Sequence, residues 1–386
     1  MRRRILILAN WYPNAVSPVS GVFIRDQARL LAERFDVTVL ALHSVGLRSF
    51  IRDRPLASIE YDGNLTVHRV HVLLPPYLSY LHFLIVIYAA WRGLHQYIHH
   101  HGRPDLIHAH VVLPCGWIAS HASRTWGIPA ILTEHTSPFT VHLYSPLQRW
   151  LVRETLKRIP VLAVSPALRQ RILEFVPATN VRVLGNVIRT HFFTPDKGSL
   201  DQERRRKRFL TIALLSDQKG IVYLLQAASL LRTKVDSPFE IVIGGDGPER
   251  PRLEHLARAL KLTDICRFVG LLDATQVRDW MRWCDVFILP SIHETFGIVL
   301  GEAMACGKPV IATRCGGPEF IVDEGCGMLV PAADAHALAD AMEQFLLSRV
   351  QYDPVLIRES VCRRFSEEAF LRNIEMIYNE IWSANE

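Results

Sequence analysis

Short apolar segments alternate with amphipathic helical segments along this chain, and this alternation constrains its fold most. In the first half, strands are expected at residues 4–9, 37–41, 65–72, 106–110, 130–133 and 161–164. A helix is expected over residues 22–35, between the first two of them. Strands that alternate with helices form a parallel sheet covered on both faces. The first half therefore predicts an α/β, doubly wound, Rossmann-like domain.

The second half repeats this order of elements. Strands are expected at residues 209–215, 239–244, 267–270, 286–289 and 310–313, and a helix over about 366–382 ends the chain. The pattern is interrupted near residues 186–208, where Pro195 and the basic run 204–208 lie. We therefore expect a second doubly wound domain after this interruption.

Length and composition agree with two globular domains. The 386 residues are 49% hydrophobic and 21% charged, and no apolar run reaches the ~18 residues of a membrane span. The first residues, 2–9, are read as a strand rather than a signal peptide, because their apolar run is short. Seven scattered cysteines without a C-x-x-C pair predict a reduced, cytoplasmic protein with neither disulfides nor zinc. A net charge of +6 is compatible with anionic partners.

Two glutamates eight residues apart, Glu294 and Glu302, carry the chemical signal. A strand-like run, 285–290, precedes them, and a helix is expected over 298–306 before a stop at 307–309. A helix that begins after a strand end presents free N–H groups and a positive dipole, which suit a phosphate. Carboxylates accept hydrogen bonds from sugar hydroxyls. The segment predicts a site for a nucleotide-activated sugar; a surface helix with two solvated glutamates is the alternative.

This segment resembles the E-x7-E segment of retaining glycosyltransferases of the GT-B architecture, in particular the large family 4 (glycosyltransferase group 1). Both glutamates, Phe296–Gly297, Glu302–Ala303 and 307–310 occur in the family's order, and the resemblance covers nearly the whole chain. Residues 5–13 and 18–24 are similar to bacterial members that assemble polysaccharides such as teichuronic acid.

The resemblance implies two Rossmann-like domains that face each other across a cleft. An N-terminal acceptor-binding domain would span residues 1–188, with a returning C-terminal helix, 365–386. A C-terminal domain that binds the nucleotide-sugar donor would span residues 189–364.

On the donor side, the resemblance implies that Lys219 stabilises the leaving diphosphate, Glu294 holds the transferred sugar and Glu302 binds the ribose. The family places an arginine about five residues before this lysine, whereas this chain has Leu214 there. Backbone groups are expected to complete the donor site at Phe296, Gly297, Ile298, Val299, Gly245 and Gly270.

On the acceptor side, His135 resembles the family's histidine near the reacting centre. His110 and Gly21 match the family's acceptor-side positions. No Asp-x-Asp motif occurs in the chain, and the family needs no divalent ion, so neither metal nor cofactor is expected. The triplet 99–101 is read as histidines at a helix end rather than a metal site.

The segment 73–98 is unusually apolar. It is either a buried helix or an exposed helix on a membrane surface, where a lipid-linked acceptor would be reached.

The resulting hypothesis is a retaining, metal-independent glycosyltransferase. It would transfer a sugar from a nucleotide-diphosphate donor to a saccharide or lipid-linked acceptor in cell-surface polysaccharide synthesis. It would work in the cytoplasm, with peripheral membrane contact left open, and would not bind nucleic acid. Two alternatives stay open: a GT-B nucleotide-sugar epimerase or hydrolase, and a non-catalytic nucleotide-sugar-binding scaffold, to which Leu214 gives some weight.

Overall fold

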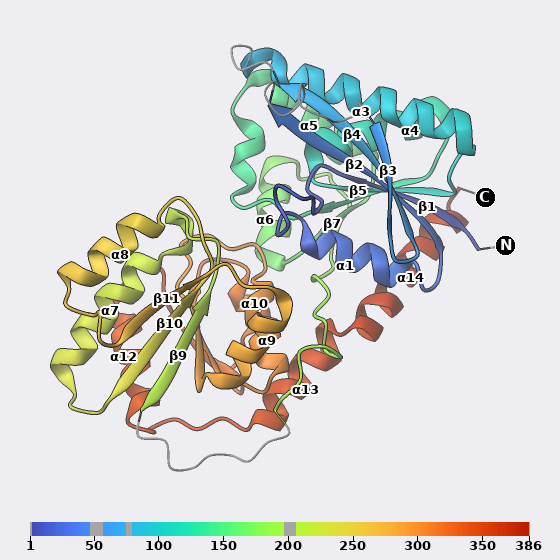
Figure 1. Ribbon diagram of the computed structural model, residues 1–386. Coiled ribbons are helices and arrows are strands. Elements are labelled where there is room, and N and C mark those ends of the chain that lie inside the picture. The colour runs from blue at the N-terminus through green and yellow to red at the C-terminus, as the bar shows by residue number, and fades with distance from the viewer. Residues whose placement is uncertain (1, 47–56, 75–78, 197–205, 386) are drawn as a thin grey trace. The chain divides into compact units, whose positions relative to one another are not determined.

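The computed structural model describes residues 2–46, 57–74, 79–196 and 206–385, so part of the basic run 204–208 and part of the apolar segment 73–98 lie outside it. The chain divides into two compact units (Figure 1). Unit 1 comprises Met1–Val187 and Leu371–Glu386, and unit 2 comprises Ile188–Phe370.

Unit 1 is built on an eight-stranded sheet with the order β3-β4-β2-β1-β5-β6-β7-β8. All neighbouring strands pair in parallel except β3 and β4, which are antiparallel. The strands are β1 (Arg4–Ala9), β2 (Asp36–Gly46), β3 (Ala57–Asp62), β4 (Leu65–Leu74), β5 (Leu106–His110), β6 (Ala130–Glu134), β7 (Val161–Ala163) and β8 (Val181–Val183). All residues of β5 and β6 are buried, and in β1 all except Arg4 are buried. This is expected for parallel strands that are covered on both faces.

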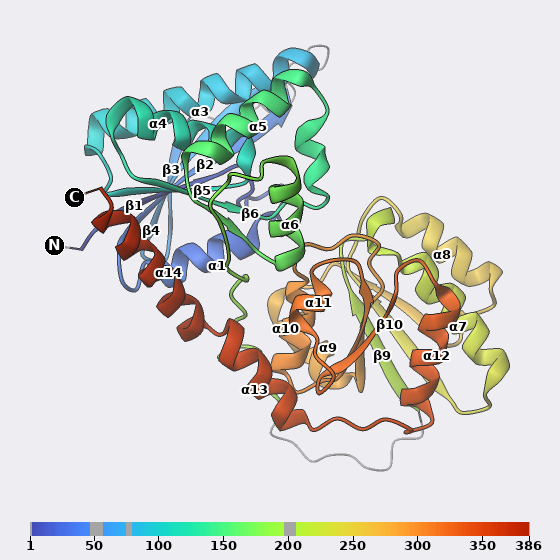
Figure 2. The ribbon, with the colours of Figure 1, turned by 180° about the vertical axis from the view of Figure 1, so that it is seen from behind.

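Helices cover both faces of this sheet. They are α1 (Val22–Leu31), α3 (Ser79–His101), α4 (Trp117–Trp126), α5 (Pro146–Arg158), α6 (Pro166–Phe175) and α14 (Glu367–Ser383), with short helical turns η1 (Val112–Gly116) and η2 (Phe139–Leu143). Helices α3, α4 and α5 lie on one face, and α1 and the unit 1 part of α14 lie on the other (Figures 1 and 2).

The last helix is fixed to unit 1 by aromatic and polar contacts. Tyr378 is fully buried, and its ring centroid lies 5.7 Å from that of Phe35. The Trp382 indole Nε1 donates a hydrogen bond of 3.0 Å to the carbonyl oxygen of Asp105. These contacts explain why the chain ends in this unit rather than in unit 2.

Several elements differ from the sequence-based expectation, which included neither β3 and β8 of unit 1 nor the strand at Gly327–Pro331 of unit 2. The edge strand β3 was not predicted, because Ile59 and Tyr61 are 56% and 80% exposed and the segment carries no continuous apolar run. Helix α1 ends at Leu31 rather than at residue 35. The residues that follow form a turn, in which the Phe35 N–H donates a hydrogen bond to the Leu31 carbonyl.

Unit 2 has a six-stranded, all-parallel sheet with the order β11-β10-β9-β12-β13-β14. Its strands are β9 (Lys207–Ile212), β10 (Phe239–Gly244), β11 (Cys266–Gly270), β12 (Val286–Leu289), β13 (Val310–Arg314) and β14 (Gly327–Pro331). Its helical elements are η3 (Asp217–Lys219), α7 (Ile221–Lys234), α8 (Arg250–Ala259), α9 (Ala274–Trp283), α10 (Ile298–Ala305), α11 (Pro318–Ile321), α12 (Ala335–Leu346) and α13 (Pro354–Phe365). Helices α7 and α12 pack against each other over one face, and α9 and α10 lie on the other (Figure 2).

The apolar segment after β4 is largely the helix α3. Val86, Ala90 and Leu94 are buried against the sheet, whereas Leu84 and Tyr88 are 47% and 65% exposed. Among the residues that the structure describes, no helix combines the length and the apolar character needed to cross a membrane.

Candidate active site

The predicted donor-side residues come from loops at the carboxyl edge of the unit 2 sheet, where ligands bind in doubly wound folds. Lys219 ends η3 and is followed by Gly220, which has φ 63°. A Cβ at Gly220 would lie 2.1 Å from the carbonyl oxygen of Pro290, so only glycine allows the two loops to approach. The Ile292 N–H also donates a hydrogen bond of 2.7 Å to the Gln218 carbonyl. The loop after β9 is thereby held against the loop after β12.

This approach brings together two predicted site residues. The Lys219 ammonium Nζ lies 2.6 Å from Glu294 Oε2, and their side chains are only 19% and 12% exposed. The Glu294 carbonyl in turn accepts a hydrogen bond of 2.8 Å from the Gly317 N–H, in the loop after β13. Three strand-end loops therefore fix the position of one carboxylate and its cation.

Helix α10 begins directly beside this pair. Its N-cap is Gly297, in the left-handed region with φ 95°, which has no side chain that could cap the first N–H groups. Phe296 is buried and anchors the turn, so Ile298 and Val299 stand in the first helical turn. Such a helix start favours an anion because its N–H groups and dipole point outward. Glu302 lies in the same helix and is half-buried.

The other two predicted donor-side glycines are hydrogen-bonded to each other. The Gly245 N–H, just after β10, donates to the carbonyl oxygen of Gly270 at the end of β11, at 2.7 Å. Leu214, which stands where the family has arginine, is 56% exposed. The substitution therefore leaves an apolar side chain in solvent rather than filling a gap in the core.

The predicted acceptor-side histidines of unit 1 also form a pair. His110 Nδ1 and His135 Nε2 are 2.9 Å apart, at the ends of the neighbouring strands β5 and β6. Burial lowers the pKa of His135 to about 4, although the charge of Glu134 raises it. Burial, with the nearby His108 and His135, lowers the pKa of His110 well below its usual value. Both rings are therefore neutral near pH 7, and each can donate one hydrogen bond and accept another.

Gly21 begins helix α1, whose first turn contacts this pair through Phe23. It is the N-cap of the helix, and a Cβ there would lie 2.2 Å from the carbonyl oxygen of Trp11. The ring of Phe23, two residues on, packs 4.7 Å from the His135 ring. The structure thus gathers the three acceptor-side predictions within one unit.

Sequence reasoning did not single out Glu134, the neighbour of His135. Its carboxylate is fully buried and accepts hydrogen bonds from the N–H groups of Val112, His135 and Thr136 at 2.7, 2.9 and 2.7 Å. Burial alone would raise its pKa, but contacts with His142 and Thr136 outweigh burial and hold the pKa at about 2. The three donors are main-chain N–H groups, which no sequence motif reveals. The sequence therefore offered one signal for Glu134, an acidic residue at the end of an apolar strand.

His108 belongs to the core rather than to the exposed end of the strand. Its Nδ1 lies 2.6 Å from the Tyr378 hydroxyl, and its Nε2 lies 2.7 Å from Thr133 Oγ1. Both ring nitrogens are therefore engaged by protein groups.

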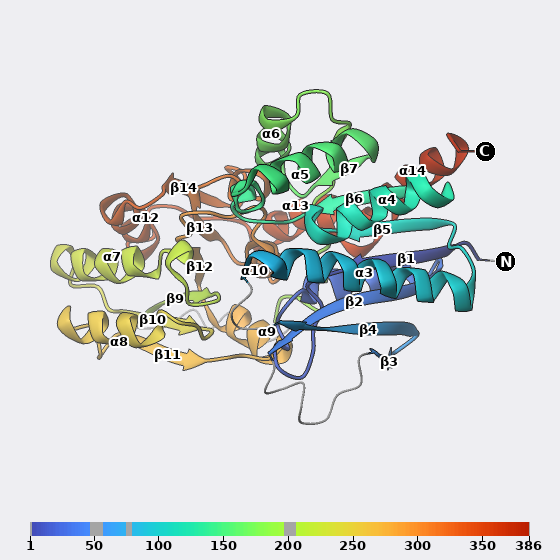
Figure 3. The same ribbon diagram turned by 90° about the horizontal axis from the view of Figure 1, so that it is seen from above.

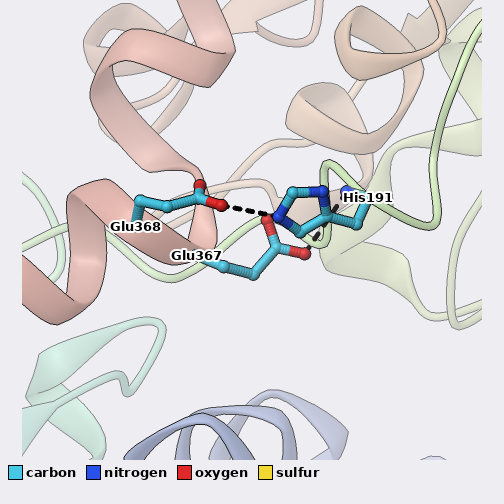
Figure 4. A group of neighbouring side chains, drawn as sticks. All are labelled: His191, Glu367 and Glu368. Carbon is cyan, nitrogen blue, oxygen red and sulfur yellow. Dashed lines mark hydrogen bonds and ion pairs between the residues drawn. The ribbon is translucent and has the colours of Figure 1, made fainter.

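A further group of potential metal ligands lies in unit 2, at His191, Glu367 and Glu368 (Figure 4). His191 Nε2 is paired with Glu368 Oε1 at 2.6 Å. Glu367 Oε2 accepts hydrogen bonds from the Thr190 N–H and hydroxyl at 3.0 and 2.7 Å. The imidazole and both carboxylates thus already have partners, and these contacts fasten the segment near the unit boundary to the start of α14.

Two family profiles together match most of the chain. Residues 20–192 match "Glycosyltransferase Family 4", and residues 193–369 match "Glycosyl transferases group 1".

Three curated relatives have similar sequences. The chain is 30% identical over 289 residues to N-acetyl-alpha-D-glucosaminyl L-malate synthase of Bacillus anthracis, covering 72% of this chain and 75% of the relative. It is 26% identical over 370 residues to TuaC of Bacillus subtilis, a protein assigned to teichuronic acid biosynthesis, covering 89% of each. It is 30% identical over 274 residues to a D-inositol 3-phosphate glycosyltransferase of Streptosporangium roseum, covering 64% of this chain and only 62% of that relative.

Solved structures show the same fold. Sucrose-phosphate synthase of Thermosynechococcus elongatus matches with a TM-score of 0.78 and 22% identity, over 99% of this chain and 100% of that one. HepE of Anabaena, solved with UDP and glucose, matches with a TM-score of 0.74 and 18% identity, over 98% and 100% of the two chains. The family resemblance and the two-domain α/β fold are therefore confirmed: this chain belongs to glycosyltransferase family 4, the glycosyl transferases of group 1, and has the GT-B fold.

Proposed function

We propose that this glycosyltransferase transfers a sugar from a nucleoside-diphosphate donor to a saccharide or lipid-linked acceptor, with retention of the anomeric configuration and without a divalent ion. The observation that carries the proposal is the Lys219–Glu294 ion pair beside the start of α10, whose N-cap is Gly297. A cation, a carboxylate and outward-facing N–H groups are together the groups that a sugar diphosphate needs. The similarity to HepE, solved with UDP and glucose, supports uridine as the first nucleotide to test.

In the proposed mechanism the diphosphate binds at the start of α10. Lys219 and the N–H groups of Ile298 and Val299 stabilise the negative charge that grows on the leaving oxygen as the glycosidic bond breaks. This preorganised positive potential supplies the role that a divalent cation has in other transferases. Glu294 accepts hydrogen bonds from hydroxyls of the sugar, and Glu302 accepts them from the ribose.

The acceptor hydroxyl attacks the anomeric carbon on the face from which the diphosphate leaves. Its proton passes to the leaving phosphate oxygen, so no side chain has to act as a strong base. A neutral His135 orients a hydroxyl by hydrogen bonding, in agreement with its lowered pKa.

Anomeric product analysis tests this proposal against its rivals. The purified chain is incubated with UDP-glucose, UDP-N-acetylglucosamine and the GDP and ADP sugars, with a panel of acceptors and with EDTA. Proton NMR of the product is expected to show a new glycosidic bond of the donor's anomeric configuration. Free sugar alone would indicate a hydrolase, a changed sugar configuration would indicate an epimerase, and binding without turnover would indicate a scaffold.

We further propose that the acceptor is reached at a membrane surface through the outer face of α3, α4 and α5. Aromatic rings connect the three helices, which lie next to one another in Figure 3. The Trp126 ring stacks on the Trp91 ring with 4.7 Å between their centroids, and the centroids of Trp91 and His121 are 4.8 Å apart. The ring centroids of Trp117 and Trp150 are 5.6 Å apart. Tryptophan is favoured at the boundary between lipid headgroups and acyl chains.

The charged residues in the sequences of α3, α4 and α5 are almost all basic. Glu154 is the one acidic residue in these sequences, and it is paired with Arg158 at 2.6 Å. The basic residues of the three helices are Arg92, Arg124, Arg149, Arg153, Lys157 and Arg158. Basic side chains beside exposed apolar ones, such as Tyr88 and Trp150, complement an anionic lipid surface.

A further inference from the structure

The proposed mechanism makes no use of one buried ionised group in unit 1, the carboxylate of Glu134. Its side chain is fully buried at the end of β6. A charge is costly to bury unless hydrogen bonds replace its hydration. Here main-chain N–H groups provide them, and such charge-assisted bonds are about twice as strong as neutral ones. The carboxylate therefore holds the main chain around it firmly.

The donors to this carboxylate belong to two separate turns. Oε2 accepts from the Val112 N–H, which follows β5, whereas Oε1 accepts from the His135 and Thr136 N–H groups, which follow β6. The two strands are parallel neighbours, with His110 opposite Thr133. One carboxylate thus bridges the turn that follows His110 and the turn that contains His135.

The turn after β5 needs such a restraint. Val111 has φ 73° and ψ 129°, a conformation that a β-branched residue rarely adopts. Backbone strain of this kind persists only where the surrounding contacts over-determine it. The Val111 N–H is bonded to the Thr133 carbonyl at 2.9 Å, and the next N–H, of Val112, is bonded to Glu134. Glu134 is therefore one of the contacts that keep the strained residue in place directly after His110.

The geometry of the histidine pair depends on both turns. A separation of 2.9 Å between His110 Nδ1 and His135 Nε2 allows one hydrogen bond, and a shift of either turn lengthens it. On the far side, His142 Nε2 lies 2.8 Å from Thr136 Oγ1 and 3.8 Å from Glu134 Oε1, so the second turn is also supported from η2.

We propose that Glu134 is a positioning residue for glycosyl transfer: its carboxylate bridges the two strand-end turns and so sets the hydrogen-bonded arrangement of His110 and His135. The role in transfer rests on the proposed function of His135 as the acceptor-side group. The arrangement of the two rings does not depend on that function.

Glu134→Gln tests the proposal in the full chain. The amide keeps one accepting oxygen, which can serve one turn, while its NH2 group cannot accept from the other. The histidine ring nitrogens are followed by ¹⁵N NMR, and transfer is followed by kcat and by KM for donor and acceptor. We expect changed ring signals for His110 and His135, and a fall in kcat of about tenfold to hundredfold, the size associated with a misplaced reactive group. The dissociation constant for UDP should stay unchanged, because the donor-side residues belong to unit 2.

Ile131→Val is the matched control. Ile131 is fully buried in the same strand, and the substitution removes one methyl group without touching a polar contact. It should lower stability while leaving the ring signals and kcat as they are. If E134Q does not fold, His142→Gln alters the contact with Thr136 in the same turn and should change the His135 ring signals relative to the wild type, and unchanged signals would then overturn the proposal.

Unchanged ring signals in E134Q would overturn the proposal. Changed signals with unchanged kcat would overturn the role of Glu134 in transfer. Absence of transfer in the wild-type chain would contradict the proposed function instead, and the ring signals would still decide whether Glu134 sets the histidine pair.

Discussion

Lys219 and Glu294, 75 residues apart in sequence, form an ion pair of 2.6 Å between two strand-end loops of unit 2. Both side chains are largely buried and hold each other in place. Neither side chain therefore has to lose conformational entropy when the donor binds. The proposed donor site is therefore preorganised around one cation and one carboxylate.

Removing the cation should abolish most of the activity. Lys219→Ala is expected to lower kcat by about 100-fold to 1000-fold, as loss of one preorganised group that stabilises developing charge does elsewhere. Initial rates with a UDP-sugar measure this. Lys234→Ala is the matched control, since Lys234 is also paired with a carboxylate, Asp340, but on the exposed surface of unit 2. Equal losses in both variants would show that Lys219 acts only through stability.

Glu302 should matter for nucleotide binding rather than for the fold. UDP at 100 times its dissociation constant should stabilise the wild-type chain by about 2.7 kcal/mol. Glu302→Gln should need a higher UDP concentration for the same rise in Tm, since an amide replaces one accepting oxygen. Its Tm without nucleotide should change little. Differential scanning fluorimetry measures both, and an unchanged UDP response would remove Glu302 from the site.

Ionisation of Glu134 should make the free energy of unfolding depend on pH in the acid range. Its pKa is about 2 in the folded chain, against a usual value of 4.5. Because the folded value is lower, the stabilisation is fully present above about pH 4.5 and is lost as the pH falls toward 2. This difference in pKa corresponds to roughly 3 kcal/mol of unfolding free energy. Urea unfolding at pH 7 and pH 3 should therefore show a gap between wild type and E134Q that narrows at pH 3; a constant gap would contradict the lowered pKa.

The hydroxyl of Tyr378 should contribute to the attachment of the last helix. Tyr378→Phe removes the contact of 2.6 Å with His108 and is expected to cost about 1–3 kcal/mol of unfolding free energy, because a buried ring nitrogen loses its partner. Tyr352→Phe, at a half-buried tyrosine of unit 2, is the control and should cost much less. Equal values for the two variants would argue against this contact.

The three-helix face should bind anionic vesicles. The chain is sedimented with phosphatidylcholine vesicles that either contain or lack phosphatidylglycerol. We expect it to bind only the vesicles with the anionic lipid, and we expect this binding to weaken as salt is added. Replacing Arg92, Arg124 and Lys157 by Gln removes about 1 kcal/mol for each charge, which is about 100-fold in affinity. The same replacement at Arg258, Arg363 and Arg372, exposed residues outside this face, changes the net charge equally and serves as the control. Equal loss in both triple variants, or binding to neutral vesicles, would contradict a specific face.

The sequence predicted the layered fold because strands buried on both faces read as continuous apolar runs. It did not predict β3, β8 or β14; in β3 the exposed Ile59 and Tyr61 give no such run. Lys219 and Glu294 were each selected by their place after a strand, but their contact depends on how closely two loops approach at Gly220. Glu134 could not be assigned, because its partners are main-chain groups that only the fold brings together. The roles of all site residues in binding and transfer stay predictions.

A crystal structure of the chain with UDP tests the central claim most directly. We predict that the diphosphate oxygens lie at the N–H groups of Ile298 and Val299 and beside Lys219, with the ribose hydroxyls on Glu302. A nucleotide bound away from the start of α10, with Lys219 still paired to Glu294 and touching no phosphate, would contradict the account.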